Sequence, residues 1–336
     1  MKRRDFLATT IVTGTVAAVL GTRVSATETN FNTGAQAASN KGRFKLRYAP
    51  HFGMFREHAG YTGNPNEAGV GKLIDELKFC ADEGFTAFED NGMRGRPVEV
   101  QEQLAREMTR LGMEMGIFVA NDRGLEKGVA ILTSGDESLR EGFLKNIRES
   151  VEVAKRVNTK RVTLVVGNSF HRLQHGYQTA NAIEALKRAS DICEPSGLVM
   201  VCEPLNIYRD HPEFFVSSNA QMYALMKGVS SPSCKVLFDI YHTQVNEGNI
   251  IPNMDRCWDE VAYIQTGDHP GRKEPFTGEI NYKNVFRHVY NKGYKGILGM
   301  EHGNSKPGKV GERAVIDAYA AADSFEIGQA TEGKTK

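Results

Sequence analysis

The sequence predicts a single (β/α)8 barrel, because three observations agree. From Arg43 onward, short apolar runs of strand type alternate with segments whose apolar residues recur three or four positions apart. Eight strand candidates can be counted, and no linker-like stretch interrupts the alternation. No G-x-G-x-x-G sequence follows the first strand, which disfavours the alternative α/β fold, a doubly wound dinucleotide-binding sheet. A chain of 336 residues holds one barrel of roughly 250 residues with tails at both ends.

The predicted strands and helices follow one another in a regular order. Strands are expected at 44–49, 86–89, 115–120, 162–166, 198–202, 235–238, 262–265 and 297–300. Between them, apolar residues at helical spacing, such as Leu73, Leu77 and Cys80, form one face that can pack on the strands. Glycines such as Gly112 and Gly197 follow the predicted helices and are typical of helix C-termini.

The N-terminus has the features of a twin-arginine export signal. Arg3 and Arg4 precede a moderately apolar stretch over 11–20, which is too short to span a membrane, and small residues around Ala26 suit a signal peptidase. This predicts an exported or periplasmic protein, with an anchored or uncleaved N-terminus as the alternative. The expected divisions are a signal peptide at 1–26, a polar tether at 27–42, the barrel at 43–305, and a C-terminal helix and tail at 306–336.

The charge composition of the chain disfavours nucleic acids and membranes as partners. The formal net charge is +1, and no basic block interrupts the chain, so nothing in the sequence indicates a nucleic-acid or membrane surface. We therefore expect a small-molecule substrate as the partner. The sequence leaves the oligomeric state open, a homo-oligomer included.

The cysteines favour buried free thiols over a disulfide framework. No CxxC pair occurs, and most of the cysteines fall inside apolar helix or strand patterns. The five are Cys80, Cys193, Cys202, Cys234 and Cys257.

Four apolar strands in the second half of the chain each end on a metal-capable side chain. These end residues are Glu203, Asp239, Gln265 and Glu301. They are separated by about one strand plus one helix, so parallel strands would carry all four to the end of the barrel where active sites lie. Each residue alone could be a strand end or a helix cap, but the regular repetition favours a shared site. Three carboxylates and an amide oxygen suit one hard divalent cation, with Mg2+, Mn2+ or Co2+ expected before Zn2+.

Two histidines are candidates for substrate binding at the same end. His242, three residues after Asp239, could share a helical first turn with it, and could bind substrate, hydrogen-bond a ligand carboxylate or simply cap a helix. His51 follows the first predicted strand and could line the same end of the barrel. Glu89 ends the second predicted strand and is a less definite candidate, because polar strand ends are often turn residues.

A long polar loop after Gln265 supplies two further candidates for substrate binding. Arg272 could hold a carboxylate or phosphate through two hydrogen bonds, whereas a salt bridge to Glu274 or Glu279 is the alternative. His269, in the same loop, could add a second contact to the substrate.

The order of these motifs resembles hydroxypyruvate isomerases, within the xylose isomerase-like sugar isomerase and epimerase barrels. The motifs are Glu203-Pro-Leu-Asn, Phe-Asp239-Ile-Tyr-His242, Tyr-Ile-Gln265 with Pro-Gly-Arg272, Thr-Gly-Glu279-Ile-Asn-Tyr and Met-Glu301, and the resemblance covers residues 43–302. It implies one divalent ion held by Glu203, Asp239, Gln265 and Glu301, with the two glutamates also moving protons. Family members tend to be cytoplasmic, so the predicted export signal is a departure.

The chemistry implied is aldose–ketose isomerisation through an enediolate. Glu203 and Glu301 would serve as base and acid, while the ion stabilises the developing negative charge. The same machinery could epimerise a ketose next to its carbonyl. A barrel nuclease with a metal cluster would need more strand-end histidines and a basic surface, and an exported sugar-binding protein without turnover would not need the second glutamate as a proton donor.

Overall fold

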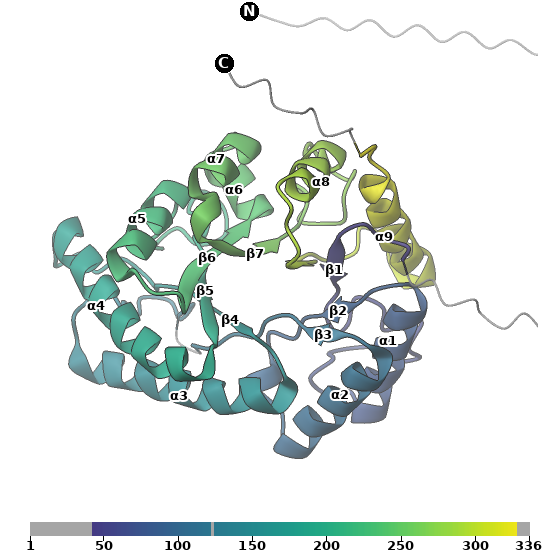
Figure 1. The fold of residues 1–336 in the computed structure, drawn as a ribbon, viewed down its shortest axis with the longest axis horizontal. Helices are drawn as coiled ribbons and strands as arrows, with labels where there is room; N and C mark the ends of the chain where they lie inside the picture. The colour runs from purple at the N-terminus through teal and green to yellow at the C-terminus, as the bar shows by residue number, and fades with distance from the viewer. Residues whose placement is uncertain (1–41, 122–123, 328–336) are drawn as a thin grey trace, which may run out of the picture. The chain divides into compact units, whose positions relative to one another are not determined.

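Eight parallel strands alternate with helices in residues 42–121 and 124–327, which the computed structural model describes (Figure 1). The strands are β1 (Arg47–Ala49), β2 (Ala87–Phe88), β3 (Glu114–Met115), β4 (Arg161–Leu164), β5 (Val199–Cys202), β6 (Cys234–Asp239), β7 (Val261–Gln265) and β8 (Ile297–Gly299). The predicted signal peptide and the tether up to residue 41 lie outside the described residues, so both stay predictions.

The strands form a ring of parallel neighbours. Six of them pair in the order β1-β8-β7-β6-β5-β4, and β2 pairs with β3. Two isolated parallel bridges join these sheets, His51 with Glu89 and Val119 with Thr163. The expectation of a TIM barrel is therefore confirmed, and all the predicted strand ends lie on one rim.

Helices cover the outside of this ring (Figure 1). Their apolar faces are buried as the spacing predicts; Leu73, Leu77 and Cys80, for example, are fully inaccessible. Gly112 ends α2 in the left-handed conformation, with φ of 71°, which fits its predicted role. The α-helices are α1 (Val70–Asp82), α2 (Val98–Leu111), α3 (Glu137–Val157), α4 (His175–Cys193), α5 (Asn219–Val229), α6 (Ile240–Asn246), α7 (Ile250–Cys257), α8 (Tyr282–Asn291) and α9 (Gly308–Asp323).

The second and third strands are shorter than predicted. Their regular pairing covers two residues each, although strands were expected at 86–89 and 115–120. Beyond them the chain still makes single ladder bonds: the Glu89 N–H donates to the Pro50 carbonyl at 2.8 Å and the Ala120 N–H donates to the Thr163 carbonyl at 2.8 Å. The apolar residues at 86–89 and 115–120 therefore belong to the barrel wall as predicted, but the regular pairing of these two strands is interrupted.

The C-terminal helix α9 packs into the barrel wall. Its last residue, Asp323, is buried and accepts hydrogen bonds from the Lys45 backbone N–H at 2.5 Å and the Tyr48 hydroxyl at 2.8 Å. Tyr319 from the same helix contacts the Tyr48 ring, with centroids 4.9 Å apart. The predicted helix is confirmed, and it ties the end of the described chain to the first strand.

Two further expectations concern burial and membranes. All five cysteines are buried and free, as predicted. Within 42–121 and 124–327, every helix is too short or too polar to cross a bilayer.

Candidate metal centre and active site

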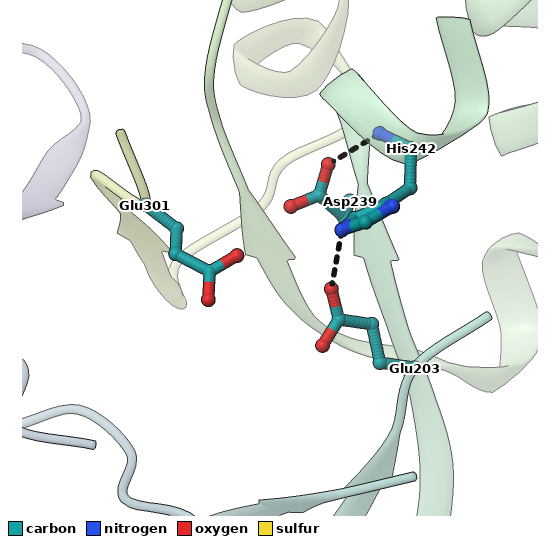
Figure 2. Close-up of side chains that lie close together, drawn as sticks. All are labelled: Glu203, Asp239, His242 and Glu301. Carbon is teal, nitrogen blue, oxygen red and sulfur yellow. Dashed lines mark hydrogen bonds and ion pairs between the residues drawn. The ribbon is translucent and has the colours of Figure 1, made fainter. Parts of the chain in front are cut away.

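Three carboxylates meet at the carboxyl ends of the barrel strands. Glu203 directly follows β5, Asp239 is the last residue of β6, and Glu301 lies two residues after β8. One atom from each, together with one from His242, forms a group whose members all lie within 4.8 Å of one another. Figure 2 shows the three carboxylates turned toward a shared space. Gln265 ends β7 and is the register partner of Asp239, so all four predicted strand ends lie together.

Three buried oxygens at the four strand ends have no hydrogen-bond partner. They are Glu203 Oε1, Asp239 Oδ2 and Gln265 Oε1, from residues that are 6%, 1% and 1% exposed respectively. Buried polar atoms are nearly always paired, and an unpaired oxygen in a low-dielectric interior is costly. A bound cation would satisfy all three at once. The donor set, carboxylates plus an amide oxygen, fits a hard divalent ion such as Mg2+ or Mn2+.

The pKa shifts of the carboxylates also favour a bound cation. Burial, followed by repulsion from Glu301 and Asp239, raises the pKa of Glu203 well above its usual value. Burial also raises the pKa of Asp239, although Arg272 opposes the shift. Arg272 alone does not balance three carboxylates, and a divalent ion would supply the remaining positive charge.

The His242 ring faces the carboxylates in its neutral form. Its Nδ1 accepts the Asn206 backbone N–H at 3.0 Å, so the neutral ring carries its proton on Nε2, which lies 3.6 Å from Glu203 Oε1. Burial lowers the pKa of His242 to about 3, so the ring is neutral at physiological pH. This arrangement disfavours His242 as a metal ligand and aims its N–H toward Glu203.

The helix that carries His242 also orients Asp239. The His242 backbone N–H donates to Asp239 Oδ1 at 2.8 Å, which caps α6. Figure 2 shows this bond as a dashed line. One oxygen of Asp239 is thereby held by the helix, and the unpaired Oδ2 is left for a ligand.

Arg272 contacts the carboxylate group directly. Its guanidinium donates to the Glu301 carboxylate and lies over the Tyr241 ring, 4.9 Å from the centroid. The predicted alternative, a salt bridge to Glu274 or Glu279, is therefore not formed. Arg272 supplies the positive charge in a cavity of about 160 Å³. The described residues lining this cavity are Asn91, Val119, Asn121, Leu125, Thr163, Leu164, Val165, Glu203, Leu205, His211, His242, Arg272 and Glu301.

The structure does not bring His51 and His269 to this cavity. His269 Nδ1 pairs with Glu279 Oε1 at 2.8 Å. His51 is held by the Phe52 and His302 carbonyls at 3.0 and 3.2 Å, and lines a separate cavity of about 570 Å³. Both rings have these partners instead of lining the carboxylate cavity, and strand position alone could not reveal this outcome.

Two residues near the site were missed or weakly indicated by the sequence. His211 lines the cavity from the loop after β5, and no motif marks it. Glu89 lies inside the barrel, where the Tyr263 hydroxyl donates to its Oε1 at 2.5 Å. Burial raises the pKa of Glu89 to about 8. In the sequence, the one signal for Glu89 is its place at the end of a predicted strand.

Comparison with known proteins identifies the family. A family model described as "Xylose isomerase-like TIM barrel" matches residues 77–322, so the chain belongs to this family. The chain is similar to hydroxypyruvate isomerase of Escherichia coli (strain K12), at 30% identity over 177 residues, which cover 53% of this chain and 67% of that protein. This similarity supports the expectation that the chain is an isomerase.

Solved structures show the same fold. An AP endonuclease, family 2, from Brucella melitensis has 22% identity and a TM-score of 0.64, covering 79% of this chain and 96% of that one. The 3-keto-D-glucoside 4-epimerase of Escherichia coli has 17% identity and a TM-score of 0.65, covering 83% and 99%. At these identities the likeness concerns the fold alone.

Proposed function

We propose that this protein is a metal-dependent isomerase that interconverts an α-hydroxy aldehyde and an α-hydroxy ketone in a small hydroxy-carbonyl compound. The observation that carries the proposal is the set of three buried, unpaired oxygens on Glu203, Asp239 and Gln265, with Glu301 beside them. Similarity to a hydroxypyruvate isomerase supports the same class of substrate.

The two glutamates are the proposed proton carriers. The reaction removes a proton from one carbon and returns one to its neighbour, so it needs a base and an acid on the same substrate. Glu203 comes from β5 and Glu301 from β8, on different parts of the rim. The divalent ion, when bound, would polarise the carbonyl and hydroxyl oxygens of the substrate.

The neighbouring side chains hold this pair in place. The His242 Nε2–H faces Glu203, and Arg272 binds Glu301. Three carboxylates, one dication and the Arg272 guanidinium leave the site without net charge. Such a site can accept a neutral sugar or, with Arg272 turned to a substrate carboxylate, a small keto acid such as hydroxypyruvate.

A ketose 3-epimerase is the second candidate, because the same pair of glutamates could remove and return a proton at one carbon. A nuclease is disfavoured, since His211 and His242 are the only histidines among the described residues that line the cavity, and the chain has a net charge of +1.

Incubation in deuterated water would test the proposed reaction. We expect the metal-reconstituted protein to convert hydroxypyruvate, in a panel with tetroses and ketohexoses, and to place deuterium on a substrate carbon. Deuterium incorporated with the carbonyl position unchanged would identify an epimerase. An absence of label from every substrate, in protein shown to bind the ion, would contradict both catalytic proposals.

A further inference from the structure

Asp268 binds both sides of the loop that carries Arg272, which joins β7 to α8 over residues 266–281. Its backbone pairs with the near side: the Asp268 N–H donates to the Lys273 carbonyl at 2.8 Å, and the Arg272 N–H donates to the Asp268 carbonyl at 2.7 Å. Its carboxylate accepts hydrogen bonds from the far side, from the backbone N–H groups of Gly278 at 2.9 Å and Ile280 at 3.1 Å. One residue therefore joins the two sides of the loop.

The Asp268 carboxylate contacts the loop and not the cavity beside the metal site. Asp268 is fully buried and is not among the described residues that line this cavity. The two sides of the loop also pack closely around it. A Cβ atom at Gly278 would lie 1.9 Å from the His269 carbonyl oxygen and 2.7 Å from Asp268 Oδ1. A change at Asp268 would therefore alter the conformation of the loop.

Arg272 depends on the conformation of this loop for its place in the site. Its φ is 49°, in the left-handed region that side chains other than glycine rarely adopt unless the surrounding structure holds them there. From this backbone position its guanidinium donates to the Glu301 carboxylate, and its Nε donates to the Glu301 carbonyl at 3.3 Å. A shift of the loop would therefore move the guanidinium relative to Glu301.

We infer that Asp268 is a positioning residue that holds the loop after β7 in the conformation that places the Arg272 guanidinium on Glu301. The inference rests on the proposed function, because it takes Glu301 as a proton carrier and Arg272 as its partner. Asp268 itself contacts neither the substrate nor the ion, so replacing it should act on turnover through Arg272.

A double-mutant cycle on the metal-reconstituted protein tests this dependence. Asp268→Asn keeps the volume of the side chain but places an NH2 group against one of the two backbone N–H groups, so the far side of the loop loses one hydrogen bond. We expect kcat/KM for the best substrate of the panel to fall by about tenfold or more, because small misplacements of a site group cost this much. In the Arg272→Met background, where no guanidinium remains to be misplaced, the same change should cost less than about twofold.

Asp323 provides a matched control. It is also a buried carboxylate that accepts from two backbone N–H groups, those of Lys45 at 2.5 Å and Leu46 at 3.2 Å, but these residues precede β1 at the opposite end of the barrel. Asp323→Asn should lower the unfolding temperature and leave kcat/KM near the wild-type value. A crystal structure of Asp268→Asn measures the place of Arg272 directly, and we expect its guanidinium to have left Glu301.

Three outcomes would overturn the inference. They are equal falls of kcat/KM in the two Arg272 backgrounds, an equal fall in Asp323→Asn, and an unchanged contact between Arg272 and Glu301 in the crystal structure of Asp268→Asn. If Asp268→Asn does not fold, Asp268→Ser, which keeps one oxygen as an acceptor, enters the same cycle. Failure of the wild type to turn over any substrate would instead contradict the proposed function, and the crystal structure would still decide the inference.

Discussion

Replacing Glu203 or Glu301 with glutamine is expected to lower turnover by about a hundredfold or more, the usual loss when a general acid or base is removed. Glutamine keeps an oxygen that can bind the ion but cannot carry the proton. Mn2+ affinity should therefore fall much less than kcat. Steady-state kinetics with hydroxypyruvate and a parallel Mn2+ titration measure the two effects separately.

A nearby carboxylate provides the matched control for these variants. Glu279 lies in the loop after β7, is exposed and pairs with His269 rather than lining the cavity. Glu279→Gln should leave turnover near the wild-type value. Near wild-type turnover in Glu203→Gln or Glu301→Gln would show that the two-glutamate transfer is wrong, and His242, which faces Glu203, would be the next candidate for the missing acid or base.

Asp239→Asn should act on the metal first. The His242 backbone N–H requires an oxygen at the Oδ1 position, so the new amide nitrogen would replace Oδ2 and point donors at the ion. We expect Mn2+ affinity to fall by at least about tenfold, because even substitutions outside the ligand set cost that much. Turnover should be partly restored by excess ion.

The control for this variant is an exposed aspartate. Asp255 pairs with Lys292 on the outside of the barrel, and Asp255→Asn should change neither affinity nor turnover. If turnover of Asp239→Asn stayed low while the ion was saturating, Asp239 would have a role in the chemistry and not only as a ligand.

The strand ends that form the site could be predicted because parallel strands repeat. Glu203, Asp239, Gln265 and Glu301 each follow an apolar run, and the barrel symmetry alone brings such residues to one rim. The same argument predicted the buried faces of the helices. The lengths of the second and third strands were predicted less well. Their pairing is interrupted, and the contacts that interrupt it are not encoded in the periodicity of the sequence.

The contacts made by loops could not be predicted in this way. Arg272 has a φ of 49°, and its loop directs the guanidinium to Glu301 instead of to the neighbouring glutamates. His269, three residues earlier, pairs with Glu279. Both residues had the right chemistry and lay close to the rim in sequence, but loop conformation decides which one reaches the cavity. The contact between Glu89 and the Tyr263 hydroxyl likewise depends on the fold, which brings two residues far apart in the sequence together.

A crystal structure of the protein reconstituted with Mn2+, with anomalous diffraction data, would test the central claim most directly. We expect one anomalous peak, bound by oxygens of Glu203, Asp239, Gln265 and Glu301 at about 2.0 to 2.4 Å. His242 should remain a donor toward Glu203, outside the coordination shell. A cluster of several ions, a peak bound through His242 nitrogen, or no peak among these four residues would contradict the account.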